Sequence, residues 1–260
     1  MYSFNSRVRY SEVNSEKELT LPSLLDYLQD CCTFQSEDMD IGVEYLAEQK
    51  QASQAASERF TELARVSSKL QEIKSYRYPQ MGQHIKVSTW PYAFRGFYGY
   101  RNFRIEGDDG IIFAEANSVW VFMDTEKMRP ARISERMKEI YTPEINDEIP
   151  GEWADRKISL PDDAVKKSVK KEPVRVSRFY IDTNHHMNNG KYILVAEEYL
   201  PEQVVVCGLR AEYRKSAMLG DMLYPVVTME GKRITVTLAD EKGAPYAVIC
   251  FQIQKKERQS

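Results

Sequence analysis

Residues 174–213, VRVSRFYIDTNHHMNNGKYILVAEEYLPEQVVVCGLRAEY, contain the order of elements that decides the fold of this protein. Val174–Ile181 alternates apolar and polar side chains well enough to predict a strand. Polar residues then interrupt the pattern, and apolar side chains return at helical spacing over Tyr192–Tyr199, ahead of Pro201. Val204–Tyr213 is rich in β-branched residues and predicts a second strand. The stretch therefore predicts a strand, a polar loop, a helix and a strand.

Three more strands are expected after this stretch, at Met222–Met229, Ile234–Leu238 and Tyr246–Ile253, because each segment is β-branched or aromatic and each is bounded by a glycine turn. One helix beside consecutive strands joined by short turns is typical of an antiparallel sheet with the helix packed on one face. The C-terminal part of the chain therefore predicts an α+β architecture.

The N-terminal half repeats this order less regularly. A strand is expected within Tyr2–Tyr10, and a helix is expected to open at Leu21. Further strands are expected at Ile85–Thr89, Tyr98–Ile105, Ile111–Met123 and Ala131–Ile133. Tyr45–Lys74 is polar with apolar residues at helical intervals, so it predicts a helix or mobile chain where the repeat requires a strand.

These patterns predict two copies of one architecture. We expect an N-terminal domain at residues 1–140 and a C-terminal domain at residues 172–260. Between them, residues 141–171 are rich in Pro, Asp, Glu and Lys, which indicates a linker.

The composition is that of a globular protein without a strong charge imbalance. The 260 residues are 42% apolar and carry a formal net charge of -3, so electrostatics gives no reason to expect nucleic-acid or membrane binding. The four cysteines show no metal or disulfide spacing, and no nucleotide, metal or flavin motif is present. Met1–Val8 lacks the apolar core of a signal peptide, and no segment approaches the ~20 apolar residues of a membrane span. We therefore expect a cytoplasmic protein with no metal and no cofactor.

The polar loop Asp182–Asn189 carries the strongest chemical signal. It contains His185 and His186, directly before the predicted helix. Unpaired backbone N–H groups at a helix start can stabilise negative charge on a carbonyl oxygen, and a nearby imidazole can take a proton from water. The loop is therefore a candidate hydrolytic site. A turn with a helix cap is the structural alternative, and a metal site built on the histidine pair is a weaker one.

The run Asp182-Thr183-Asn184-His185-His186-Met187-Asn188-Asn189-Gly190-Lys191-Tyr192 closely resembles the signature Asp-x-Asn-x-His-(hydrophobic)-Asn-Asn-x-x-Tyr of acyl-acyl-carrier-protein thioesterases. Further segments resemble the same family, namely Val87–Pro91, Gly99–Phe103, Ala116–Trp120, Arg129–Ile133 and Glu212–Lys215. The resemblance covers almost the whole chain. It implies a double hotdog, in which each of two fused domains packs a long helix on an antiparallel sheet. It also implies an acyl pocket in the N-terminal hotdog and one active site, on the second hotdog.

The resemblance also implies roles by position. His186 would be the general base for water, Asn184 would orient or polarise the thioester carbonyl, and Asp182 would hold the network in place. The backbone near Asn188 and Asn189 would serve the oxyanion.

This chain departs from the family at two places. Many relatives carry Glu where this chain has Ser216, whose hydroxyl can position water but cannot act as a charged base. Residues 52–74 are longer and more polar than the strand that helps to wall the acyl pocket in relatives. His185 occupies a variable position of the signature, so we do not expect it to be catalytic.

The implied function is hydrolysis of a fatty acyl thioester of acyl carrier protein, giving a free fatty acid and the carrier thiol. Carrier proteins are acidic, and six basic residues are expected to form a docking patch, namely Arg175, Arg178, Lys191, Arg210, Arg214 and Lys215. Two alternatives remain open: an acyl-coenzyme A thioesterase of the same fold, and a non-catalytic hotdog protein that binds acyl chains. Fused hotdogs often pair, so a homodimer is compatible with this reading.

Overall fold

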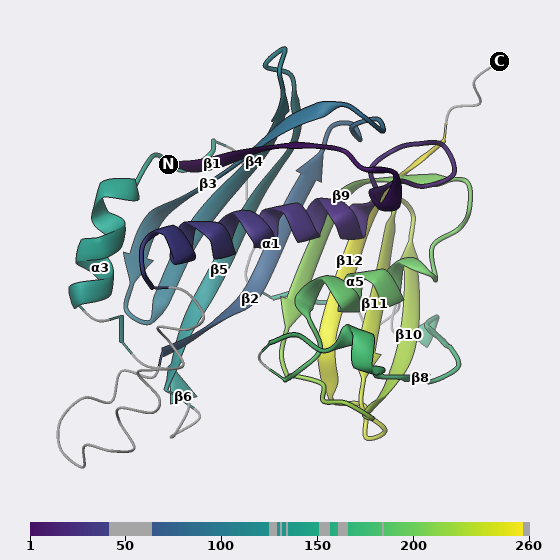
Figure 1. The fold of residues 1–260 in the computed structure, drawn as a ribbon. Helices are drawn as coiled ribbons and strands as arrows, with labels where there is room; N and C mark the ends of the chain where they lie inside the picture. Colours follow the sequence, from purple (N-terminus) through teal and green to yellow (C-terminus); the bar gives the residue numbers. More distant parts are fainter. Residues whose placement is uncertain are drawn as a thin grey trace. The chain divides into compact units, whose positions relative to one another are not determined.

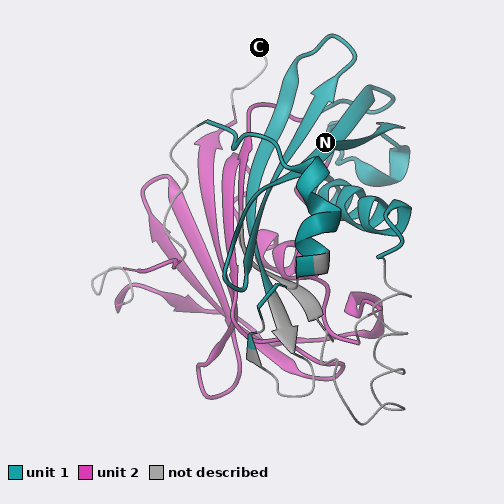
Figure 2. Ribbon diagram, turned by 90° about the vertical axis from the view of Figure 1, so that its left-hand side faces the viewer, with its two compact units in different colours: residues 1–19, 23–68, 79–151 teal, residues 20–22, 69–78, 152–260 magenta. Residues whose placement is uncertain are grey.

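The computed structural model forms two compact units, each an α+β arrangement of a helix and an antiparallel sheet (Figures 1 and 2). The structure describes residues 1–41, 64–124, 129–130, 132–133, 135–150, 157–160, 166–183 and 185–256. Unit 1 comprises residues 1–19, 23–68 and 79–151, and unit 2 comprises residues 20–22, 69–78 and 152–260. No helix within the described ranges combines the length and apolar character needed to cross a membrane.

Unit 1 packs helix α1 (Leu21–Asp38) on an antiparallel sheet with the strand order β1-β3-β4-β5 (Figure 1). The strands are β1 (Tyr2–Arg7), β3 (His84–Arg95), β4 (Tyr98–Gly107) and β5 (Ile112–Asp124). Shorter elements are η1 (Tyr10–Glu12), β6 (Arg129–Pro130), α3 (Glu135–Tyr141) and η2 (Thr142–Glu144). The apolar residues Leu24, Leu28 and Cys31 fall on one face of α1 and are at most 2% exposed, so this face forms the core of the unit.

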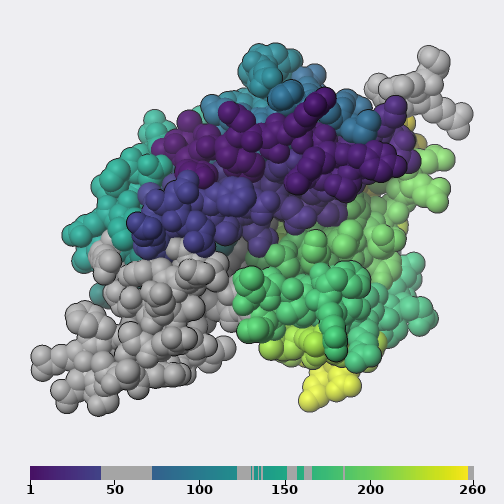
Figure 3. Space-filling view, in the orientation of Figure 1, coloured from purple at the N-terminus to yellow at the C-terminus, as the bar shows by residue number. Residues whose placement is uncertain are grey.

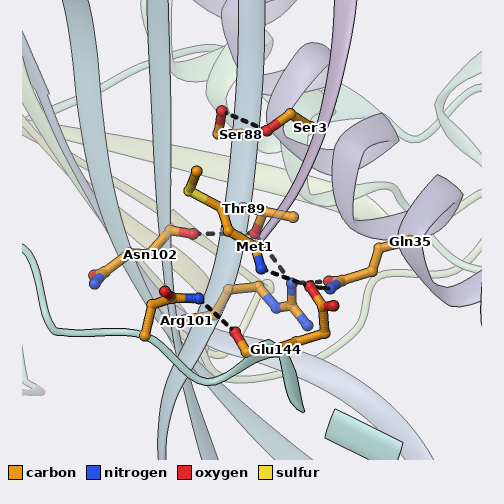
Figure 4. Close-up of polar contacts among 9 residues, drawn as sticks. Met1, Ser3, Gln35, Ser88, Thr89, Arg101, Asn102 and Glu144 are labelled. Atoms are coloured by element: carbon orange, nitrogen blue, oxygen red, sulfur yellow. Dashed lines mark hydrogen bonds and ion pairs between the residues drawn. The ribbon is translucent and has the colours of Figure 1, made fainter. Parts of the chain in front are cut away.

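A buried arginine lies where the helix–sheet interface of unit 1 becomes polar (Figure 4). Arg101 of β4 is 7% exposed, and its Nη1 donates hydrogen bonds to Gln35 Oε1 on α1 and to Thr89 Oγ1 on β3. The amide of Gln35 donates in turn to Glu144, and the Arg101 guanidinium lies 5.5 Å from the ring centroid of Tyr141. Because a buried polar group is costly unless it is hydrogen-bonded, these bonds satisfy Arg101 and link α1 to the sheet.

Unit 2 contains an antiparallel sheet in the order β2-β9-β12-β11-β10-β7, with β8 paired to β10, and residues 69–75 of β2 belong to it. The strands are β2 (Ala64–Ser75), β7 (Val169–Lys170), β8 (Val174–Arg175), β9 (Val204–Tyr213), β10 (Met222–Glu230), β11 (Arg233–Ala239) and β12 (Pro245–Lys255). Helix α5 (Asn189–Glu197) contacts β11 and β12 and buries Ile193 and Ala196 completely. The predicted helix and the four predicted strands after it are therefore confirmed.

The expectation of a helix or mobile chain over Tyr45–Lys74 is wrong for the part that the structure describes, which is strand β2. Residues 42–63 lie outside the described residues. Leu70–Lys74 pairs in antiparallel register with β9, and Ile73 is 1% exposed. Backbone pairing with a neighbouring strand outweighs the helical spacing of a few apolar residues.

The single strand expected at Val174–Ile181 is also wrong. It is reduced to β8, and the 3-10 helix η3 (Arg178–Tyr180) follows it. The amide of Val176 donates to the carbonyl of Asp221, and the carbonyl of Val176 accepts from the amide of Gly220. These bonds extend the contact into the turn before β10, and from Arg178 the chain forms η3 ahead of the polar loop.

Two further details differ from the sequence-based boundaries. Val169–Lys170, inside the segment expected to be a linker, forms β7 and pairs with β10. The strand expected at Ala131–Ile133 lies instead at β6, and Ala131 is outside the described residues. In both cases the partner strand, rather than the local composition, decides where pairing begins.

Candidate active site

The polar loop of unit 2 is a tight turn that leads directly into α5. The amide of His185 donates to the carbonyl of Asp182 at 3.0 Å, and the amide of Asp182 donates to the carbonyl of His186 at 2.9 Å. Ile181 and Met187 form an isolated antiparallel bridge just outside the turn. His185 at the tip has a φ of 63°, a left-handed conformation that costs a non-glycine residue about 1–2 kcal/mol. The turn therefore holds Asp182 and His186 opposite each other.

The side chains of Asp182 and His186 meet across this turn. Nδ1 of His186 lies 4.0 Å from Oδ1 of Asp182, and the two side chains are 17% and 21% exposed. Directly opposed residues of a narrow antiparallel pair place their side chains on the same side, which accounts for the proximity. The distance is longer than a hydrogen bond, but a carboxylate this close stabilises the imidazolium that forms when the ring accepts a proton. The pair can therefore act as a general base with a charge partner.

The helix that follows presents its positive end to the same loop. Asn188 is the N-cap of α5, and its Oδ1 accepts a hydrogen bond from the amide of Gly190 at 2.8 Å. The amide of Asn188 donates to the carbonyl of Tyr180 at 2.8 Å. The amide of Asn189, the first residue of the helix, has no acceptor among the residues that the structure describes. Of the two residues expected near the oxyanion, Asn189 is thus the one with an unbonded amide in the described part of the chain, and the oxyanion role stays a prediction.

Ser216 lies in the segment that runs beside this loop, and its side chain is exposed. Its neighbour Ala217 is fully buried, and the carbonyl of Ala217 accepts a hydrogen bond from the amide of Met187 at 2.9 Å. The fold therefore brings the segment of Ser216 beside the loop that carries His186, although the two residues are 30 positions apart in the sequence.

Tyr192 is a site residue to which the sequence assigned no role. Its hydroxyl accepts a hydrogen bond from the amide of Ala217 at 2.8 Å, and burial raises the pKa of Tyr192 to about 12. Its ring lies 5.8 Å from that of Tyr213, whose hydroxyl donates to the carbonyl of Asn189 at 3.2 Å. The two tyrosines thus anchor the Ser216 segment and the start of α5. The sequence offered one signal for Tyr192, which is that the family signature ends at this tyrosine.

The geometry does not test the role of Asn184. This residue lies outside the described residues, so its role stays a prediction. Within the described ranges, no group of three or more His, Cys, Asp or Glu side chains is placed to hold a metal ion. The described geometry thus gives the histidine-pair metal alternative no third ligand.

Both halves of the chain match known families. Residues 1–141 match the acyl-ACP thioesterase N-terminal domain, and residues 163–243 match the acyl-ACP thioesterase C-terminal domain. A chloroplastic palmitoyl-acyl carrier protein thioesterase of Cuphea hookeriana is 30% identical over 167 residues, which cover 61% of this chain and 40% of that protein. The chloroplastic oleoyl-acyl carrier protein thioesterase 1 of Arabidopsis thaliana is 24% identical over 239 residues, covering 85% of this chain and 62% of that protein. The chain thus spans less than two thirds of the length of either relative.

Two solved structures share the fold over nearly their whole length. An acyl-ACP thioesterase from Bacteroides thetaiotaomicron has a TM-score of 0.80 at 17% identity, with 97% of each chain covered. The 12:0-ACP thioesterase from Umbellularia californica has a TM-score of 0.81 at 18% identity, with 98% of this chain and 97% of that chain covered.

The fold defines an α+β double hotdog protein, and the loop before α5 gives it a candidate histidine-based site at a helix start. Because the two matched domains account for most of its length, the chain belongs to the acyl-ACP thioesterase family. The resemblance read from the sequence is thereby confirmed.

Proposed function

We propose that this protein hydrolyses the thioester of a fatty acyl-acyl-carrier-protein, giving a free fatty acid and the carrier thiol. The observation that carries the proposal is the pairing of His186 with Asp182 directly before α5. Membership of the family supplies the substrate class. The N-terminal hotdog would bind the acyl chain, as the resemblance implies.

The reaction follows from the chemistry of the loop. His186 takes a proton from water as the water oxygen attacks the thioester carbonyl carbon. The carbonyl oxygen becomes negatively charged and accepts the amide hydrogen of Asn189 at the start of α5. Collapse of this intermediate breaks the carbon–sulfur bond, and the imidazolium of His186 returns the proton to the leaving sulfur. Water is consumed, and the acid and the thiol are the products.

The remaining predicted residues support these steps. Asp182 stabilises the charged form of His186 from 4.0 Å. Asn184 would orient or polarise the carbonyl, the role that the family signature implies. Ser216 would position the attacking water through its hydroxyl. No cofactor enters this scheme.

The test is thiol release from a series of saturated acyl-carrier-protein thioesters of increasing chain length, with matched acyl-coenzyme A thioesters. We expect faster turnover on the carrier-protein substrates and a loss of at least about 100-fold in His186→Ala. Equal or faster turnover on the coenzyme A series would favour the coenzyme A thioesterase. Thiol release from no substrate, or release that His186→Ala leaves intact, would refute the proposal. A cytoplasmic location and a homodimer stay predictions.

A further inference from the structure

We infer that the acyl carrier protein docks on an exposed apolar and basic surface of unit 2 that borders the catalytic loop. This inference rests on the proposed function and adds the surface on which the carrier protein docks. The surface, called the carrier face below, consists of Arg175, Arg178, Phe179, Met218, Leu219 and Met222.

Backbone hydrogen bonds join the two segments that form the carrier face. Arg175 and Met222 are directly opposed in the β8–β10 pair, so their side chains lie on one side of it. Leu223, the next residue of β10, is fully buried, so the side with Arg175 and Met222 is the one that faces solvent. The amide of Val176 donates to the carbonyl of Asp221 and continues the connection beyond the strands. Residues distant in the sequence are therefore held side by side.

The same segments border the loop that carries His186. Tyr180, next to Phe179, accepts a hydrogen bond from the amide of Asn188. Ala217, next to Met218, accepts one from the amide of Met187. The carrier face therefore adjoins the loop at both of its segments. In Figure 3 the green atoms, the colour of the residues around 180–190, lie at the surface of the molecule.

The apolar members of the carrier face are unusually exposed as a group. Phe179 is 71% exposed, Leu219 56%, Met218 47% and Met222 37%. One exposed apolar residue is ordinary, but four on two connected segments beside a candidate active site mark an interaction surface. Methionine and aromatic side chains are also enriched at protein interfaces.

The charges of the carrier face suit an acidic partner. Arg175 and Arg178 are exposed and form no ion pair with any described residue. Three other residues of the predicted basic patch are ion-paired within unit 2: Arg210 with Glu72, Arg214 with Glu212 and Lys215 with Asp240. Because the whole chain carries a net charge of -3, attraction of an acidic carrier has to be local, and these two guanidinium groups, unpaired among the described residues, can supply it.

The one carboxylate inside the same stretch does not oppose this attraction strongly. Oδ2 of Asp221 accepts a hydrogen bond from the amide of Met218 at 2.9 Å and one from the hydroxyl of Tyr246 at 3.2 Å. These donors offset part of its negative charge where it stands. Within the two segments of the carrier face, residues 175–180 and 218–222, two arginines therefore stand against one hydrogen-bonded carboxylate.

The test combines Arg175→Glu with Arg178→Glu in the full chain. Fluorescence anisotropy measures binding of labelled acyl carrier protein, and thiol release measures kcat/KM for an acyl-carrier-protein thioester and for the same acyl group on N-acetylcysteamine. We expect carrier affinity to fall at least about tenfold, and kcat/KM for the carrier substrate to fall at least about tenfold more than for the small thioester. Raised salt should weaken carrier binding to the wild type more than to the variant.

Arg233→Glu is the matched control, because Arg233 is an exposed arginine of unit 2 without an ion pair to a described residue. In the strand register Arg233 lies opposite Glu230, at the far end of β10 and about 27 Å along that strand from Met222. We expect Arg233→Glu to keep wild-type carrier affinity. Leu219→Ser tests the apolar contribution and should weaken carrier binding without changing its salt dependence.

Three outcomes would overturn the carrier face: wild-type carrier affinity in the double arginine variant, an equal loss on both thioesters, or a loss in Arg233→Glu of the same size. Binding to phosphatidylglycerol vesicles that depends on Arg175 and Arg178, with no such dependence for the carrier, would assign the surface to a membrane and also overturn it. The two proposals fail separately. Carrier binding without thiol release would refute only the proposed function, and thiol release with unchanged carrier binding in the variant would refute only the carrier face.

Discussion

The amide of Ala217 donates a hydrogen bond of 2.8 Å to the hydroxyl of Tyr192, and this contact ties the segment after β9 to helix α5. Ala217 is fully buried, and its carbonyl accepts the amide of Met187. Ala217 is therefore hydrogen-bonded both to helix α5 and to the loop that carries His186. The geometry of the site depends on this link as well as on His186.

Replacing Tyr192 with Phe tests the link, because the ring is kept and only the acceptor is lost. The buried amide of Ala217 would lose its partner, which costs about 1–3 kcal/mol of unfolding free energy. We expect a lower Tm and a lower kcat with KM unchanged. Tyr199→Phe is the control, since the hydroxyl of Tyr199 bonds to no described residue. A lower Tm with wild-type kcat would show that the contact is structural only.

Asp182→Asn tests the charge partner of His186. The amide keeps the size of the side chain but removes the negative charge that stabilises the imidazolium from 4.0 Å. We expect kcat to fall by about 100-fold with little change in Tm. His185→Asn serves as the control, since His185 is exposed and Asn tolerates its left-handed backbone. Equal losses in the two variants would remove Asp182 from the mechanism.

Ser216→Glu introduces the residue that the family resemblance implies for this position. Ser216 is exposed and adjoins Ala217, so a longer side chain has room and begins beside the loop. A carboxylate near the attacking water adds a second base, and we expect turnover on acyl-carrier-protein substrate to rise by about tenfold. Ser216→Gln has the same size without the charge and should leave turnover near that of the wild type. Unchanged or reduced turnover in Ser216→Glu would count against a role for this position.

Glu197 makes the stability of the protein depend on pH. Burial raises the pKa of Glu197 to about 7, and the charge of Glu198 adds to the effect. Between about pH 4.5 and pH 7 the folded state keeps a proton that the unfolded state releases, so the free energy of unfolding falls as pH rises. The loss is at most about 3 kcal/mol and is complete above pH 7. Below pH 4.5 both states are protonated and the contribution vanishes.

Urea unfolding of Glu197→Gln between pH 4.5 and pH 8 checks this dependence. The variant should be more stable than the wild type at pH 8 and similar at pH 4.5, because glutamine does not ionise. Glu202→Gln, at an exposed position, should keep the wild-type profile. A Glu197→Gln profile that falls as steeply as that of the wild type would place the effect at another group.

Local patterns in the sequence were sufficient for much of the fold. The helix at Tyr192–Tyr199 and the strands after it carry their periodicity in their own side chains, and turn glycines bound them. The Asp-x-Asn-x-His run identified the family and brought Asp182 and His186 together, because the two residues face each other across a single turn. A contact made within five residues is readable without knowledge of the rest of the chain.

The tertiary structure decided what depends on distant partners. Polar residues near Leu70 form a strand because β9 offers them a backbone ladder. The segment Val174–Ile181 pairs with β10 only over Val174–Arg175 and then forms η3. The structure also shows that the amide of Asn188 is bonded to the carbonyl of Tyr180, whereas the amide of Asn189 has no acceptor among the described residues. Hydrogen bonds over such separations depend on where another segment folds, and no window of sequence contains that information.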